Sequence, residues 1–162
     1  MKKYIPILLF IIIPLFYSCV SSDQPNYAHV FSSITALNNG QNWTVNLTDT
    51  LTKDTMVLHA QWKHEIFRIK FPVTSSAFAL TGNGDQYFNT DNSGNITKTF
   101  KLDKNYANTV TSIQNVTVNS LNKYVTGQFK MRFVIDPTGI NTDTTGTDTV
   151  TLTNGRFTAT YK

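Results

Sequence analysis

The sequence predicts one all-β domain of antiparallel strands behind an N-terminal export signal. Apolar residues alternate with polar ones at a period of two, which is the side-chain period of a strand. Clusters of Asn, Asp and Gly interrupt this alternation, as turns do. No segment carries a sustained apolar stripe at the helical period of about 3.6 residues. We therefore expect an antiparallel β-sandwich or flattened barrel of roughly eight to ten short strands.

Residues 1–18 have the pattern of a secretory signal peptide. Lys2 and Lys3 give a positive start, and an uncharged apolar run follows them. A bilayer-spanning helix needs ~20 apolar residues, whereas this run is shorter and contains two prolines. Ser18, a small residue, directly precedes Cys19, which is the only cysteine of the chain. The pattern predicts cleavage between these two residues.

The position of Cys19 resembles the lipobox of bacterial lipoproteins, in which the cysteine after the cleavage site is diacylated and becomes the new N-terminus. Phe16 and Tyr17 stand where a lipobox typically has an aliphatic and a small residue. An ordinary signal peptide with an incidental cysteine is therefore the alternative. We expect lipid attachment at Cys19, because chemistry on that thiol best explains its single use. The resemblance implies a bacterial cell-envelope protein anchored to a membrane, with the outer membrane expected.

Composition limits what the exported part does. Residues 19–28 lack periodicity and are expected to form a tether, and residues 29–162 a single β domain. Without Lys2 and Lys3, 12 basic and 10 acidic side chains remain, so the net charge is near +2. This charge is too weak to indicate a nucleic-acid partner. An acylated Cys19 leaves no thiol for disulfides or thiolate-bound metals.

The first strands follow from alternation. Trp43, Val45 and Leu47 alternate with polar neighbours after the turn signal Asn-Asn-Gly over 38–40. The next two apolar faces are Met56, Leu58, Ala60 and Trp62, and then Phe67, Ile69 and Phe71. Short strands separated by Gly- and Asn-rich turns follow over 81–95.

The clearest strand covers residues 124–135. Its expected inner face consists of Val125, Phe129, Met131, Phe133 and Ile135. In the last strand Val150 and Leu152 have even parity, whereas Phe157, Ala159 and Tyr161 have odd parity. Because strand side chains alternate strictly, the parity must be reset between the two groups, and we expect a β-bulge at Gly155. The polar loop 136–148 is expected to join the last two strands as a hairpin with a disordered tip.

The first and last hairpins resemble those of an uncharacterised family of small β-rich lipoproteins from Bacteroidota-type bacteria. The matching elements are the stretch "NGQNW" in the first hairpin and, in the last, "GQF" followed by "TNGRF". The positions that carry the resemblance in the closing hairpin are Gly127, Phe129, Asn154, Gly155 and Phe157. The resemblance implies lipidation and a β fold. It implies no catalytic residues, because the family has no assigned activity.

The densest cluster of metal-ligand residue types is His59, His64 and Glu65. In a regular strand His59 and His64 point to opposite faces, and so do the neighbours His64 and Glu65. We therefore expect solvent-facing histidines and no zinc site. The loops 89–95 and 141–146 carry the oxygen side chains of a calcium loop but lack the EF-hand pattern. Ordinary turns are expected there, with calcium as the weaker alternative.

The sequence contains no nucleophile motif, so we expect no enzymatic activity. Asp85, Asp91 and Asp103 could still meet in space as catalytic carboxylates, although no local pattern marks them. Lys98, the first of three spaced lysines, shares the parity of apolar neighbours and suggests a gatekeeper on an edge strand. Trp43 and Trp62 fall on expected inner faces, which favours core packing over sugar stacking.

Two functions remain open from the sequence. The first is a non-catalytic binding or structural accessory module of the cell envelope, without a cofactor or metal. Its partner would be a protein, a glycan or a small molecule, bound by the loops 81–95 or 136–148. The alternative is a small ligand carrier or hydrolase whose site is assembled from separated residues in a barrel mouth.

Overall fold

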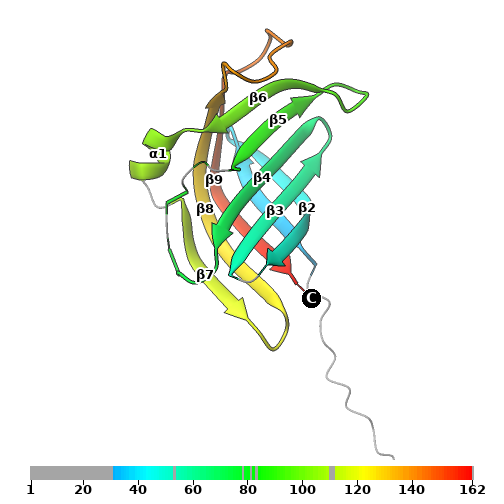
Figure 1. The fold of residues 1–162 in the computed structure, drawn as a ribbon. Helices are drawn as coiled ribbons and strands as arrows, with labels where there is room; N and C mark the ends of the chain where they lie inside the picture. Colours follow the sequence, from blue (N-terminus) through cyan, green and yellow to red (C-terminus); the bar gives the residue numbers. More distant parts are fainter. Residues whose placement is uncertain are drawn as a thin grey trace, which may run out of the picture.

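The chain forms a single antiparallel sheet that closes into a barrel (Figure 1). The computed structural model describes residues 31–52, 54–77, 79–80, 82, 84–109 and 112–161. The elements are β1 (Ser33–Asn38), β2 (Gln41–Thr52), β3 (Thr55–Trp62), β4 (Glu65–Pro72), β5 (Gln86–Thr90), β6 (Ile96–Leu102), α1 (Lys104–Thr109), β7 (Ile113–Asn119), β8 (Tyr124–Ile135) and β9 (Thr149–Thr160). The expected all-β class is confirmed.

Pairing between β6 and β8 closes the barrel. The eight barrel strands run β6-β5-β4-β3-β2-β1-β9-β8, and β8 returns to β6 through the pair Phe100 and Ile135 and the pair Leu102 and Phe133. β7 is an extra strand, which pairs with the first half of β8. β8 thus has β6 beside its second half and β7 beside its first half. Of the two expected architectures, the barrel is the one observed.

The barrel interior is filled by the side chains that alternation places inside. Trp43, Leu58, Phe67, Phe133 and Leu152 are among the buried residues, each with a relative exposure of 1% or less. Phe67 contacts Trp43 edge-on at a ring-centroid distance of 5.8 Å and Phe133 at 6.1 Å. Burying such aromatic side chains is the main favourable term in folding, at roughly 25 cal/mol per Å² of apolar surface.

The barrel has two different ends. The loop end carries the turns 39–40, 63–64 and 91–95 and the loop 136–148. The terminal end carries the first and last described residues, where Ser32 Oγ lies 2.8 Å from Thr160 Oγ1. In Figure 1 the loop 136–148 is at the top, and the C-terminus lies near the bottom beside the start of β1. The first and last described residues therefore lie at the end of the barrel opposite the loop end.

The predicted bulge is present in β9, but the reason for the glycine differs from the expected one. The β9 register shifts between Gly155 and Leu152 against β8, and also shifts against β1. Asn154, with φ of 52°, adopts the left-handed conformation of the bulge, as Asn readily does. Gly155 does not have a positive φ; a β-carbon there would come nearer than 3.0 Å to the ring of Phe129.

The loop 136–148 joins the antiparallel neighbours β8 and β9 as a hairpin, as expected, and it packs along β6. The backbone N–H groups of Asp136 and Thr142 donate to the carbonyl oxygens of Thr99 and Thr97. Gly139 lies so close to Thr99 that a β-carbon would clash with it. The expectation of a disordered tip is therefore wrong, because backbone hydrogen bonds fix this polar loop to the neighbouring strand. The short helix α1, which follows β6, was also not predicted.

Candidate functional site

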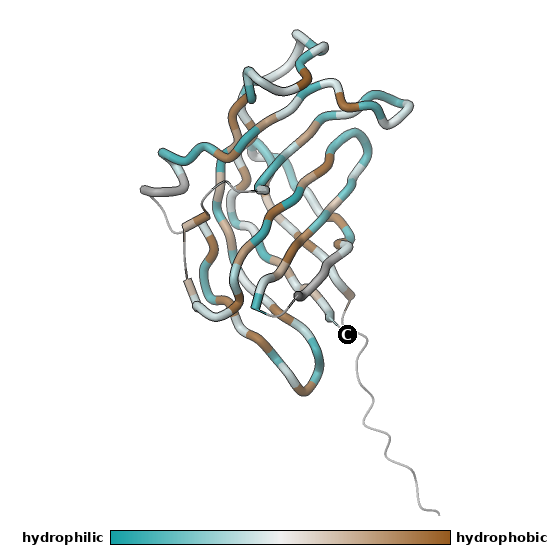
Figure 2. Tube along the Cα trace, viewed as in Figure 1, coloured by the Kyte–Doolittle hydropathy of each residue, from teal (hydrophilic) through white to brown (hydrophobic). Residues whose placement is uncertain are grey.

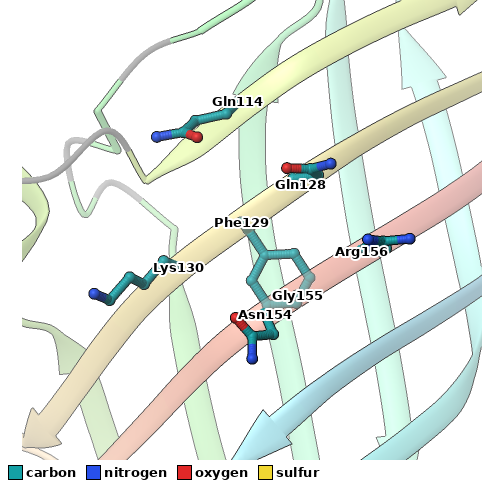
Figure 3. Close-up of a pocket in the computed structure, with 7 residues that line it drawn as sticks. All are labelled: Gln114, Gln128, Phe129, Lys130, Asn154, Gly155 and Arg156. Atoms are coloured by element: carbon teal, nitrogen blue, oxygen red, sulfur yellow. The ribbon is translucent and has the colours of Figure 1, made fainter.

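A polar groove lies on the outer wall of the barrel where β7, β8 and β9 run side by side (Figure 3). Its volume is about 430 Å³. It is lined by Gln114, Gln128, Phe129, Lys130, Asn154, Gly155 and Arg156. In Figure 3 Lys130 and Arg156 lie on opposite sides of Gly155, with amide side chains above and below it. We call this hollow the outer groove.

Two bulges flank β8 and shape the outer groove. On one side β9 bulges at Asn154, and on the other β7 shifts register between Gln114 and Thr117, where Asn115 has a φ of 52°. The N–H of Lys130, opposite the β9 bulge, donates to the carbonyl oxygen of Ser112 at 2.9 Å. Because bulges disrupt the regular ladder and bend the strand, they separate the outward side chains and leave a hollow between them.

A second, smaller hollow continues the outer groove along the same wall. Its volume is about 220 Å³, and it shares Gln128 and Arg156 with the first. These two residues pair directly across β8 and β9. The amide of Asn115 donates to Gln128 Oε1 at 3.2 Å, which orients the glutamine side chain. The polar surface is therefore longer than either hollow alone.

The outer groove carries positive charge and has no carboxylate among its lining residues. Its two ionisable lining residues are Lys130 and Arg156, and no acidic residue lines it. The ion pairs among the described residues are Lys98–Asp148, Lys101–Asp136 and Arg132–Asp103, so neither groove cation is paired within that part of the chain. The Lys130 amine lies 5.8 Å from the ring centroid of Tyr106 in α1. This helix thus supports one end of the groove.

Asp103 and Arg132 form the polar contact behind that helix. Arg132 Nε donates to Asp103 Oδ2 at 2.8 Å, and the Arg132 guanidinium lies 4.9 Å from the Tyr106 ring centroid. Burial raises the pKa of Asp103, but the hydrogen bonds from Arg132 and from the N–H of Tyr106 and Asn105 outweigh it and lower the pKa overall. Asp103 is therefore occupied in fixing α1 onto β8.

A second polar cluster lies inside the barrel at the loop end. The amide of Asn38 donates to Glu65 Oε1 at 3.2 Å and to the hydroxyl of Tyr87 at 3.0 Å. Burial, and then the charge of Glu65, raise the pKa of the Tyr87 hydroxyl far above its ordinary value. Within the described residues, Glu65 Oε2 and Trp43 Nε1 are buried without a hydrogen-bond partner. Buried polar atoms normally form a hydrogen bond with a water molecule or with another polar group.

Lys98 belongs to the same end and is not the edge-strand gatekeeper that was expected. It is 1% exposed, because β6 is paired on both sides and the loop 136–148 covers it. Its amine donates to the carbonyl oxygen of Thr145 at 2.8 Å and lies 3.5 Å from Asp148 Oδ1. The buried cation therefore ties the loop to the barrel.

The structure separates the histidine cluster considered for a metal. His59 is exposed on β3, and His64 lies in the β3–β4 turn with Nδ1 3.3 Å from the carbonyl oxygen of Asp91. Glu65 points inward to Asn38. Among the described residues, no three His, Cys, Asp or Glu side chains are grouped closely enough to hold a metal ion.

Each of the three aspartates considered for catalysis has hydrogen-bond partners of its own. Asp85 is buried, and its two carboxylate oxygens accept the N–H groups of Lys70 at 2.9 Å and Gly82 at 3.0 Å. Asp85 thus accepts a hydrogen bond from a β4 backbone N–H that lies beyond the last β4–β5 pair. Burial raises the pKa of Asp85 more than the two hydrogen bonds lower it. Asp91 accepts the N–H groups of Ser93 and Asn95 within its own turn. Each carboxylate has a local structural role.

Of the remaining residues that the sequence singled out, the structure describes the two tryptophans but not Cys19. Trp43 is buried in the core as expected, and Trp62 is half-buried with the Lys63 amine 4.4 Å from its ring centroid. Cys19 lies outside the described residues. The loops 81–95 and 136–148, named as binding loops, do not line the outer groove. Sequence reasoning named Phe129, Asn154 and Gly155 for the fold, but it did not predict a groove there.

Comparisons with protein-family models, curated proteins and solved structures found no match. The resemblance of the hairpins to a lipoprotein family therefore stays an expectation. No helix among the described residues combines the length and apolar character needed to cross a membrane.

Proposed function

We propose that this protein is a lipid-anchored bacterial envelope protein that binds an acidic glycan in the outer groove without transforming it. The lipid would be attached at Cys19, as the lone cysteine directly after a signal-type segment predicts. The barrel would present the groove on its side wall. The outer membrane is the expected site of the anchor, in keeping with the hairpin resemblance to envelope lipoproteins.

The proposed ligand class rests on the side chains that line the outer groove. Three amide side chains, from Gln114, Gln128 and Asn154, offer both donors and acceptors to hydroxyl groups. Arg156 and Lys130 stand on either side of the groove centre without a carboxylate partner in the described chain. An arginine fork binds a carboxylate through two charge-assisted hydrogen bonds. Hydroxyls with spaced carboxylates are the chemistry of a uronic-acid oligosaccharide.

Binding fits these groups better than catalysis does. Hydrolysis of a glycosidic bond typically uses a pair of carboxylates, and no acidic residue lines the groove. The groove volume of about 430 Å³ suits a ligand site but leaves the ligand open to solvent on one side. These features support a protein that holds a glycan and does not cleave it.

The barrel mouth supports a second candidate, a small ligand carrier or hydrolase. The unpartnered Glu65 Oε2 and Trp43 Nε1 favour it, since a ligand hydroxyl could donate to Glu65 Oε2 and accept from Trp43 Nε1–H. Against it, both atoms are buried, and the rings of Trp43, Phe67 and Tyr87 fill the interior beside them. A carrier would have to repack this core to admit a ligand.

A binding assay with matched oligosaccharides tests the proposed ligand class. The mature protein, in detergent, is titrated with a uronic-acid oligosaccharide and with a neutral one of the same linkage and length. We expect binding of the acidic ligand only, weakened at least about tenfold by Arg156→Gln, because a charge-assisted hydrogen bond is lost. Arg68→Gln, on the outer face of β4, is the matched control and should bind like the wild type.

Three outcomes would count against the proposal. They are equal affinity for the neutral oligosaccharide, wild-type affinity of the Arg156→Gln variant, and binding of inorganic phosphate that displaces the acidic glycan at equal concentration. The last would point to a phosphate-bearing ligand for the same cations.

Anchoring is tested separately by phase partitioning. The wild-type protein expressed in a bacterium with lipoprotein processing should enter the detergent phase, and Cys19→Ser should stay in the aqueous phase. Equal partitioning of both proteins into water would contradict lipidation at Cys19.

A further inference from the structure

Large exposed apolar side chains gather at the terminal end of the barrel. Phe31 is 79% exposed, Leu121 81% and Val118 42%, and the only other large hydrophobic residue of this kind in the described chain is Ile140. Leu121 lies in the turn between β7 and β8, which forms the lowest point of the barrel in Figures 1 and 2. Three of the four therefore share one end of the molecule.

Backbone and side-chain hydrogen bonds hold these residues on one rim. Ser32, next to Phe31, accepts the N–H of Thr160 at 2.9 Å. The N–H of Tyr161 donates to the carbonyl oxygen of Lys123 at 2.9 Å, and the Lys123 amine lies 5.7 Å from the Tyr161 ring centroid. We call the set Phe31, Val118, Leu121, Lys123 and Tyr161 the terminal rim. It combines aliphatic, aromatic and cationic side chains.

This combination matches the interface of a lipid bilayer. Aromatic side chains with a polar tip favour the boundary between headgroups and acyl chains, and lysine reaches anionic headgroups from an apolar stem. Single exposed hydrophobic residues are common on soluble proteins and need no partner. The informative feature is their position at the end where the chain enters the domain.

The tether length also favours contact with the bilayer. Phe31 stands 12 residues after Cys19. Such a segment spans at most roughly 40 Å when fully extended, and much less as a flexible coil. A lipid on Cys19 would therefore keep the terminal rim close to the membrane and raise its effective concentration there.

We propose that the terminal rim contacts the bilayer surface, so that the barrel stands on the membrane with its loop end directed away from it. This inference rests on the proposed acylation of Cys19. The lipid anchors the chain, and the rim adds a second, weaker contact that orients the domain on the bilayer. The outer groove, on the side wall, stays open to solvent in this orientation.

Site-specific probes on the complete mature lipoprotein test the contact. With Cys19 acylated, a cysteine introduced by Leu121→Cys is the only free thiol and takes an environment-sensitive fluorophore. Ile140→Cys is the matched control, because Ile140 is an exposed apolar residue on the loop 136–148 at the other end. Both proteins are reconstituted in vesicles of phosphatidylcholine and phosphatidylglycerol and separated by flotation.

We expect a blue-shifted emission at position 121 that a lipid-bound nitroxide quenches severalfold more strongly than the emission at position 140. A water-soluble quencher should show the reverse order. If the two quenchers affect the emission of floated protein alike at both positions, the rim does not contact the bilayer, although the protein is still lipidated. Shielding of position 121 from both quenchers would also overturn the rim contact, because protein and not lipid would then cover the rim. Protein that fails to float and carries a reactive Cys19 thiol would overturn both the anchor and the contact.

Discussion

The ring of Phe129 occupies the space that a side chain on Gly155 would need. The two residues pair across β8 and β9, and a β-carbon built on Gly155 would lie nearer than 3.0 Å to the Phe129 ring. The same relationship recurs two residues along, where the Phe157 ring covers Gly127. Each strand thus supplies one glycine and one phenylalanine. These reciprocal pairs fill the inside of the wall whose outside carries the outer groove.

Gly155→Ala should therefore destabilise the barrel by about 1–3 kcal/mol, because the new methyl group overpacks a filled site. Gly155→Val should cost more, since it adds two further methyl groups to the same space. Urea unfolding of both variants measures the effect. The double variant Gly155→Ala with Phe129→Leu should recover part of the loss relative to the sum of the single changes. Strict additivity would mean that the ring is not the cause.

The parts of this fold that the sequence predicted are those that depend on alternation within a single strand. A period of two is visible residue by residue, so it correctly placed Trp43 and Phe133 inside, and the parity change located the bulge beside Gly155. The closure between β6 and β8 joins segments distant in sequence and leaves no local mark. The same holds for Lys98, whose burial depends on how the loop 136–148 folds over it.

The outer groove was not predictable for a related reason. Gln114, Gln128 and Arg156 are polar residues on outward positions of three different strands, which is what any solvent-facing sheet contains. Only the register between these strands brings them together, and two bulges set that register. Asp85 is similar, because its role follows from the point where β4–β5 pairing stops.

Replacing the buried Lys98 should release the loop without unfolding the barrel. In Lys98→Met the hydrogen bond to the Thr145 carbonyl is lost, while an apolar stem of similar length refills the space. The partner Asp148 is exposed and stays hydrated, so no buried charge is left unpaired, and we expect a change in unfolding free energy within about 1.5 kcal/mol. Hydrogen exchange at the amides of Thr142 and Asp143 should nevertheless accelerate.

Lys101→Met is the control for that experiment. Its side chain is 52% exposed and its amine lies 3.5 Å from Asp136 Oδ1, so loss of this surface pair should leave the exchange of the loop amides unchanged. Unchanged exchange in Lys98→Met as well would show that the lysine does not hold the loop.

Acid should destabilise the barrel partly through Asp103. Its pKa is lowered in the folded protein from the ordinary value of 3.8, so the unfolded chain takes up the proton first as the pH falls. The stabilisation is complete above that ordinary value and is lost as the pH drops through the lowered pKa. Urea midpoints at pH 6 and at pH values below 4 should therefore differ less in Asp103→Asn than in the wild type. An identical pH dependence in both proteins would contradict a stabilising role for the Asp103–Arg132 pair.

Removing divalent cations should not change the stability of the barrel. The loops 89–95 and 141–146 have hydrogen bonds of their own, such as those that Asp91 and Asp143 accept from nearby N–H groups. We expect the same thermal midpoint with and without a chelator. A midpoint that falls by many degrees would reveal a structural metal, since its binding free energy is lost on removal.

Amide chemical-shift mapping tests most directly whether the outer groove binds an acidic glycan. Labelled mature protein is titrated with the uronic-acid oligosaccharide while backbone and side-chain amide signals are followed. We expect saturable shifts concentrated at the groove residues Gln114, Gln128, Lys130, Asn154, Gly155 and Arg156. Shifts concentrated in the loop 136–148 or around Glu65 and Trp43, or no saturable shifts at all, would contradict glycan binding in the outer groove.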